Sequence, residues 1–110
     1  MKVKLREIAG IIRSKNAGPY ELTLDIMFND FDLYRKVKQA GAVNKEFMCR
    51  LYGISPDKIL DIINFDPAGA IKITMIRPTV SGDVGDTDIY GAQQHAPLLD
   101  AEIILRGDQI

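Results

Sequence analysis

Tyr20-Glu21-Leu22-Thr23-Leu24-Asp25-Ile26-Met27-Phe28 is the stretch of sequence that decides the class of fold. Apolar side chains recur there at every second position, so an extended backbone places them on one face. The apolar face holds Leu22, Leu24, Ile26 and Phe28, and the polar face holds Glu21, Thr23 and Asp25. This pattern predicts a half-buried strand of an antiparallel sheet, with its apolar face against the core.

Four further segments are expected to be strands. Residues 59–65 are rich in β-branched side chains, and residues 70–77 alternate between apolar and polar positions. The intervening Asp66-Pro67-Ala68-Gly69 is typical of a tight turn, so we expect a hairpin. Residues 98–105 predict a closing strand with Leu99, Ala101, Ile103 and Leu105 on one side. Residues 5–12 fit a strand or a helix, and we interpret them as a strand because a polar, loop-like segment follows.

Two short helices are predicted from the signals at their ends. A helix that runs to about Ala40 would begin at a capping Asn29 or Asp30 and stop at Gly41. A second short helix would be capped by Asn44, carry Phe47, Met48 and Leu51, and end at Gly53. The sequence therefore predicts an α+β fold: a mainly antiparallel sheet of four to five strands with two short helices on one face.

Composition limits the kind of protein. The chain has 110 residues, which suits a single domain over residues 1–110. Its formal charge of −1 gives no basic face for nucleic acid, and no apolar run is long enough to span a bilayer. The basic N-terminus lacks the apolar core of a signal peptide, and the lone Cys49 excludes an internal disulfide. We expect a cytoplasmic protein with no nucleic-acid or membrane partner.

A first candidate site lies in the polar segment at residues 13–19. Arg13, Ser14, Lys15 and Asn16 offer two cations, a hydroxyl and an amide between two predicted strands. An arginine fork with a lysine beside it suits a carboxylate or a phosphate, so these four residues are candidate substrate-binding groups. The alternative is a solvated turn, in which Asn16 and Gly18 supply unusual backbone angles.

A second candidate site lies in residues 85–98, around the only histidine, His95. His95 could act as a general base if Asp86 or Asp88 oriented its imidazole, which makes these three the candidate catalytic residues. The groups that could orient a substrate or a partner are Tyr90, Gln93 and Gln94. The alternative for the histidine is a hydrogen bond to backbone where Pro97 follows.

A metal site is the weaker interpretation of the same segment. Asp83, Asp86, Asp88 and His95 could ligate a divalent cation, but their spacing matches no known metal-binding loop. A solvated acidic turn, with Asp side chains bonding nearby backbone donors, explains them as well. No metal and no cofactor is therefore expected.

At these two segments the chain resembles a small bacterial family catalogued as domain of unknown function 4387. The matching residues are 13–19, 21–25 and 85–99, and the resemblance covers nearly the whole chain. Members of that family look like stand-alone relatives of the small C-terminal domain of acyclic terpene utilisation proteins of the AtuA type. That domain is described as ferredoxin-like, and the resemblance implies the same fold here. It also implies a larger AtuA-like protein as partner, encoded nearby and associated with catabolism of branched acyl compounds as coenzyme A thioesters.

The leading hypothesis is a small accessory or catalytic subunit of a two-component enzyme of hydratase, dehydratase or lyase type. Its substrate would be a small carboxylic acid or an acyl-CoA thioester, held by Arg13 and Lys15, while His95 with Asp86 or Asp88 handles a proton. The hypothesis requires the segment around Arg13 to lie beside the segment around His95. The alternative is a non-catalytic assembly module, and a stand-alone metal-dependent enzyme is a third interpretation. A homo-oligomer is also possible.

Overall fold

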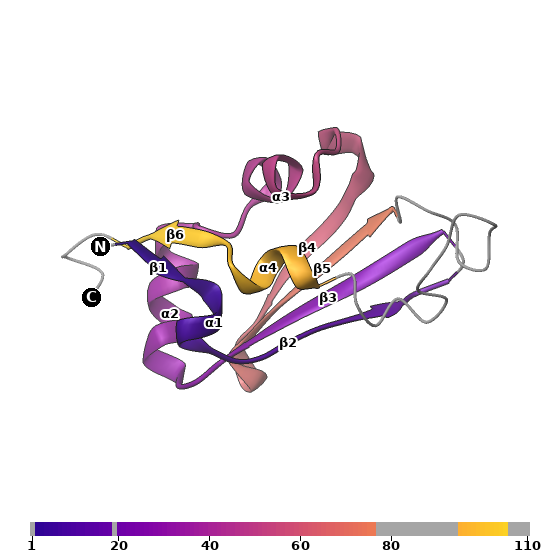
Figure 1. Cartoon of the computed structure of the whole chain (residues 1–110). Coiled ribbons are helices and arrows are strands. Elements are labelled where there is room, and N and C mark those ends of the chain that lie inside the picture. The colour runs from indigo at the N-terminus through magenta and orange to yellow at the C-terminus, as the bar shows by residue number, and fades with distance from the viewer. Residues whose placement is uncertain (1, 19, 77–94, 106–110) are drawn as a thin grey trace.

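The computed structural model describes residues 2–18, 20–76 and 95–105 (Figure 1). In chain order the elements are β1 (Lys2–Lys4), α1 (Leu5–Ile8), β2 (Ala9–Asn16), β3 (Glu21–Phe28), α2 (Phe31–Ala40), α3 (Lys45–Tyr52), β4 (Ile59–Phe65), β5 (Ala70–Ile76), α4 (Ala96–Leu99) and β6 (Glu102–Ile104). Short 3-10 turns at Pro56–Lys58 and Asp66–Ala68 precede β4 and β5.

The main sheet has the strand order β2-β3-β5-β4. β3 and β4 each pair antiparallel with β5, so they run parallel to each other, and α2 and α3 connect them. This arrangement is the split β-α-β unit of ferredoxin-like folds. β2 pairs antiparallel with β3 and supplies the fourth strand at the edge, here from the N-terminal side of the unit. The predicted α+β class with antiparallel strands is confirmed.

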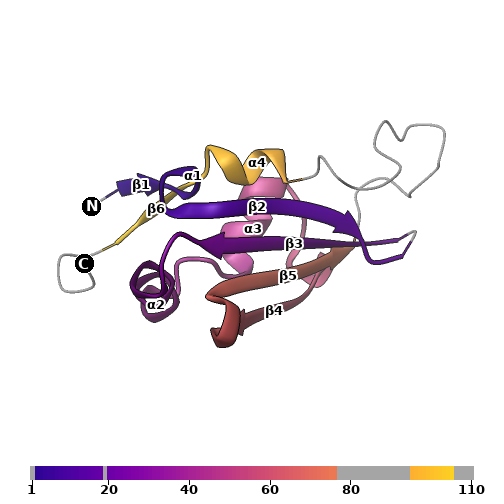
Figure 2. The same ribbon diagram turned by 90° about the horizontal axis from the view of Figure 1, so that it is seen from below.

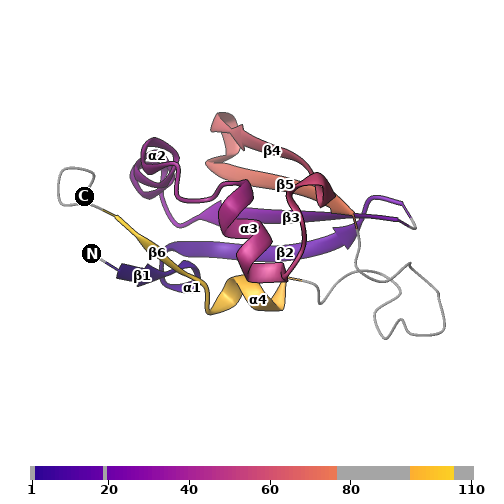
Figure 3. The ribbon, with the colours of Figure 1, turned by 90° about the horizontal axis from the view of Figure 1, so that it is seen from above.

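The core lies on one face of this sheet. Leu22, Leu24 and Ile26 of β3 are fully buried, and each stands opposite a buried residue of β5. Burying an aliphatic side chain of this size contributes roughly 1.5–3 kcal/mol, so β3 anchors the domain. α3 lies behind the strands in Figure 2 and in front of them in Figure 3, which shows that it covers the core face. The described helices leave the other face of the sheet open (Figure 2).

The predicted helix ends are confirmed. The Asp30 side chain accepts a hydrogen bond from the backbone N–H of Leu33 at the start of α2, and Asn44 accepts one from Phe47 at the start of α3. Each cap satisfies a backbone donor that has no partner inside the helix. Both helices end at a glycine in the left-handed conformation, as their sequences predict.

The interpretation of residues 5–12 as one strand is wrong in its first half. Leu5 and Ile8 are three residues apart and both buried, and a single turn of helix, α1, places both side chains against the core. The Leu5 N–H is bonded to the carbonyl of Ala101, which fixes the start of that turn. The strand β2 begins only at Ala9.

Residues 13–16 are strand, although a loop was predicted. β2 continues through Asn16 because each residue from Ile11 onwards has a partner on β3, as far as the pair of Asn16 with Leu22. The ladder of backbone hydrogen bonds therefore outweighs the polar composition of the segment. The loop is confined to the next few residues, where Gly18 has a φ of 133°.

The closing segment is also more divided than predicted. Residues 96–99 form the short helix α4, in which Leu98 is fully buried, and β6 is shorter than the predicted strand. The predicted alternation is confirmed at Ala101, Ile103 and Leu105, all of which are buried. β6 pairs with β1 in a separate two-stranded sheet, which the sequence analysis did not anticipate.

Candidate functional site

β2 divides the residues of the first predicted site between the two faces of the sheet. Ser14 stands opposite the buried Leu24, so its side chain lies on the core face. Asn16 shares that face by the alternation of the strand. Arg13 stands opposite Asp25 and Lys15 opposite Thr23, so both cations lie on the open face.

Asp25 is the centre of the polar contacts on the open face. The Arg13 guanidinium donates through Nε to Asp25 Oδ2 at 3.0 Å, with 53% of the Arg13 side chain exposed and 12% of the Asp25 side chain. Lys72 stands opposite Asp25 from the other side, on β5. Asp25 and Thr23 are buried rather than solvated, because β3 is a central strand between β2 and β5.

Residues that stand opposite one another on neighbouring strands form a row across the open face. The row next to that of Arg13, Asp25 and Lys72 is apolar. Met27 stands opposite Ile11 on one side and Ala70 on the other, and Ala70 stands opposite Phe65. Phe65 and Ile11 are each about half exposed. A charged row and an apolar row thus lie side by side on one face.

A pocket of about 420 Å³ opens on this face. Its lining residues come from four strands and the β4–β5 turn: Arg13, Lys15, Asp25, Met27, Ile63, Phe65, Ala68, Ala70 and Lys72. Three cations against one carboxylate leave this open-face pocket with a formal charge of +2, although the whole chain carries −1. Its volume is that of a small-molecule site, and its charge favours an anion with an apolar part.

Two smaller hollows lie between α3 and β6 and have volumes of about 290 and 210 Å³. Both are lined by Arg50 and Glu102, whose charges cancel. These hollows therefore offer no excess charge to hold an ionic ligand.

Ser14 and His95 meet on the core side of the edge strand. The His95 backbone N–H donates to Ser14 Oγ at 3.1 Å, and His95 Nδ1 lies 3.4 Å from the same oxygen. His95 is half-buried and immediately precedes α4, while Ser14 is 6% exposed. The structure therefore brings Ser14 together with His95, but Arg13 and Lys15 lie on the opposite face.

The other residues of the second predicted site lie outside the described residues. They are Asp86, Asp88, Tyr90, Gln93 and Gln94, together with Asp83 of the weaker metal interpretation. Within the described ranges, no group of three histidine, cysteine, aspartate or glutamate side chains is placed to hold a metal ion.

Sequence reasoning missed most of the open-face pocket, since only Arg13 and Lys15 of its lining residues were candidate site residues. Lys72, Met27 and Phe65 were not singled out, although the alternation of residues 70–77 does set Lys72 apart from Ile71 and Ile73. The sequence does not show how the strands are aligned with one another. Only the pairing of β3 with β5 shows that Lys72 stands opposite Asp25 and so shares a row with Arg13.

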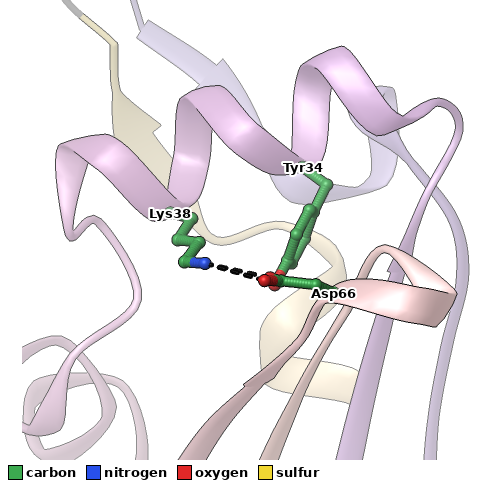
Figure 4. Close-up of polar contacts among 3 residues, drawn as sticks. All are labelled: Tyr34, Lys38 and Asp66. Carbon is green, nitrogen blue, oxygen red and sulfur yellow. Dashed lines mark hydrogen bonds and ion pairs between the residues drawn. The ribbon is translucent and has the colours of Figure 1, made fainter.

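A second polar cluster joins α2 to the β4–β5 turn (Figure 4). The buried Tyr34 hydroxyl donates to Asp66, and Lys38 Nζ lies 2.9 Å and 3.2 Å from the two oxygens of that carboxylate. Burial, and then the hydrogen bond to Asp66, raise the pKa of Tyr34 to about 12. The same bond, helped by Lys38, lowers the pKa of Asp66. A tyrosine kept protonated in this way is suited to fastening the turn rather than to transferring a proton.

Fold and site together define a small α+β domain whose ferredoxin-like sheet carries a cationic, apolar-floored pocket on its open face. The chain belongs to the family described as domain of unknown function (DUF4387), whose model matches residues 5–102. No curated protein and no solved structure matches the chain. None of the described helices is long and apolar enough to cross a membrane.

Proposed function

We propose that the chain is the small subunit of a two-component enzyme and binds an acyl compound in the open-face pocket. The ligand is a small carboxylic acid or its coenzyme A thioester, and the partner is a larger AtuA-like protein. The reaction class that we favour is hydration, dehydration or lyase cleavage. The observation that carries the proposal is the pocket itself, with Arg13, Lys15 and Lys72 set beside an apolar floor.

The charges on the open face support binding of an anion. Asp25 engages Arg13 through Nε, and a guanidinium has a second edge, formed by its two Nη groups, that suits a carboxylate or a phosphate. A charge-assisted hydrogen bond contributes roughly 1.5–3 kcal/mol, which corresponds to at least about a tenfold change in affinity. A free acid would present a carboxylate to these cations, and a thioester would present the phosphates of its carrier.

Proton handling by His95 with Asp86 or Asp88 is a separate part of the proposal. A ligand in the open-face pocket lies across β2 from His95. β2 is at the edge of the main sheet, so a long thioester can extend around it whereas a short acid cannot. Binding and turnover therefore need separate tests.

Calorimetric titration tests the binding part. The wild-type chain is titrated with isovalerate, with its coenzyme A thioester, with coenzyme A alone and with inorganic phosphate. We expect Arg13→Ala and Lys72→Ala to weaken binding about tenfold or more. Lys45→Ala, which removes an exposed lysine at the start of α3, is the matched control and should bind as the wild type does. Wild-type affinity in both pocket variants would refute the proposal.

Turnover by the complex tests the catalytic part. The chain is coexpressed with the larger AtuA-like protein, and loss of the acyl-CoA substrate is followed for the wild type, Arg13→Ala and His95→Ala. We expect Arg13→Ala to raise KM and His95→Ala to lower kcat, because one residue binds and the other handles a proton. Full activity in both variants would remove these residues from the mechanism.

A non-catalytic assembly module is the second candidate, and one observation favours it. Ile63 and Phe65 are about half exposed on the open face, where a partner could cover them. Analytical ultracentrifugation of the chain alone and with the larger protein measures self-association and complex formation. If Phe65→Ser abolishes the complex while no acyl ligand binds the wild type, the assembly role replaces the enzymatic one.

A further inference from the structure

The open-face pocket has a charged end and an apolar end. The charged row contains Arg13, Asp25 and Lys72, and the apolar row beside it contains Met27 and Ala70. Neighbouring rows on one face are two residues apart along a strand, which is about 7 Å. A ligand with an anionic group and an apolar tail can therefore bind in only one orientation along the strands, with its anionic group on the charged row and its tail on the apolar row.

Two alanines leave room at the apolar end. Ala70 lies between two much larger side chains, because Met27 stands opposite it on β3 and Phe65 on β4. Ala68, in the turn before β5, lines the same end of the pocket. A small residue flanked by large ones makes a hollow, since its neighbours reach higher above the sheet.

We infer, on the basis of the proposed function, that the ligand's anionic group lies between Arg13 and Lys72 and its acyl tail runs over Ala70 to Ala68. The two alanines then determine the largest tail that binds. Asp25 is a positioning residue in this arrangement, because it holds Arg13 by Nε and leaves the two Nη groups for the ligand. The ligand class is a monocarboxylate with a short apolar chain, whose carboxylate and tail are close enough to span the two rows.

Affinity across a series of acids tests the orientation. NMR titration of the wild-type chain with acetate, butyrate, isovalerate and hexanoate should show tighter binding as the tail grows. Each buried methylene should tighten Kd roughly fourfold until the hollow is filled. Ala70→Leu should abolish this gain for butyrate and hexanoate and leave the affinity for acetate unchanged.

Two further variants keep the test decisive. Thr74→Leu is the matched control, because Thr74 lies on the same strand and the same face but does not line the pocket. It should keep the wild-type preference for longer tails. Ala68→Leu should act as Ala70→Leu does, and because Ala68 is exposed in a turn, it gives the answer if Ala70→Leu does not fold.

The possible failures are distinguishable. If Arg13→Ala abolishes binding but neither alanine variant alters the dependence on tail length, the orientation is wrong and the proposed function stands. If Arg13→Ala leaves the binding of every acid intact, the proposed function fails and the orientation fails with it. If Thr74→Leu removes the tail preference as Ala70→Leu does, the alanines are not the determinants.

Discussion

Ser14 Oγ accepts a hydrogen bond from the backbone N–H of His95 at 3.1 Å, across 81 positions of the chain. The bond ties the start of α4 to the edge strand β2, and Ser14 is the buried member of the pair. The residue that precedes α4, His95, makes no capping hydrogen bond with its own side chain. The Ser14 hydroxyl of β2 instead accepts a hydrogen bond from the His95 N–H at the start of the helix. Ser14 therefore has a structural role, whether or not His95 takes part in chemistry.

Replacing Ser14 by alanine should lower the free energy of unfolding by about 1 kcal/mol, because it removes a hydrogen bond and leaves a half-buried donor without its partner. Urea denaturation followed by circular dichroism measures the change. Ser55→Ala is the control, since the Ser55 hydroxyl donates to Asp57 at the exposed surface. Equal effects of the two substitutions would show that the Ser14–His95 contact adds no stability.

Tyr34→Phe should destabilise the chain by about 1 kcal/mol near neutral pH, because it removes the hydrogen bond that the Tyr34 hydroxyl donates to Asp66. Since folding raises the pKa of Tyr34 from 10.0 to about 12, the stabilisation is complete below pH 10.0 and is lost as the pH rises through about 12. The difference in stability between the wild type and Tyr34→Phe should therefore shrink over that interval. Burial also raises the pKa of Tyr52, but this contribution is common to both proteins and cancels. A constant difference across the interval would contradict the assignment.

Asp66→Asn tests the contribution of the carboxylate in the same cluster. Folding lowers the pKa of Asp66 below its usual 3.8, so its stabilising effect is present above pH 3.8 and is lost as the pH falls through the lower folded value. The wild type should be more stable than Asp66→Asn near neutral pH, and the two should converge in acid. Urea denaturation at a series of acid pH values measures this, and a gap that persists at the lowest pH would exclude the carboxylate as its source.

Gly69→Ala should cost about 1 kcal/mol because the residue has a φ of 58°, which L-residues adopt only with strain. An added Cβ would lie 3.8 Å from Tyr34 Cβ, an ordinary contact, so the cost comes from the backbone and not from a clash. Gly41→Ala is the matched control, since φ is 60° there and no atom lies within 4 Å of the added Cβ. Thermal unfolding should give similar losses for both, and a much larger loss for Gly69→Ala would indicate crowding against Tyr34.

Ile73→Ala and Ile63→Ala compare the two faces of the sheet. Ile73 is fully buried on the core face. Ile73→Ala should therefore lower the free energy of unfolding by about 2–5 kcal/mol, because it removes buried apolar surface and leaves a cavity. Ile63 is about half exposed on the open face, and its truncation should cost well under half as much. Denaturant midpoints of the two variants measure the difference. Comparable losses would mean that the open face is covered in solution, as it would be in a homo-oligomer.

Local patterns were enough to predict most of the elements. The alternation at residues 21–28 and the caps at Asp30 and Asn44 depend on neighbours in the sequence, and the structure confirms them. Residues 5–8 and 13–16 were interpreted wrongly because their structure depends on distant partners. α1 is fixed by Ala101, and the strand at residues 13–16 by β3. The local sequence does not show which distant residues these segments contact.

The candidate site was predictable only in part, for a related reason. Arg13 and Lys15 share one face of the sheet and line one pocket, but treating their segment as a loop hid the alternation that separates them from Ser14. Once the segment is known to be strand, a period of two places Ser14 on the other face. Lys72 joins Arg13 only through two successive strand pairings, and single-sequence reasoning does not supply that register.

The pairing of β1 with β6 has a consequence for biosynthesis. The β2–β3 and β4–β5 hairpins join neighbours in the chain, but Val3 pairs with Ile103, so its partner leaves the ribosome 100 residues later. We expect the nascent chain to form its hairpins early and to keep Val3 and Leu5 uncovered until residues 101–104 have been synthesised. Premature termination before residue 101 would release a chain without this closure, which is a natural substrate for chaperones.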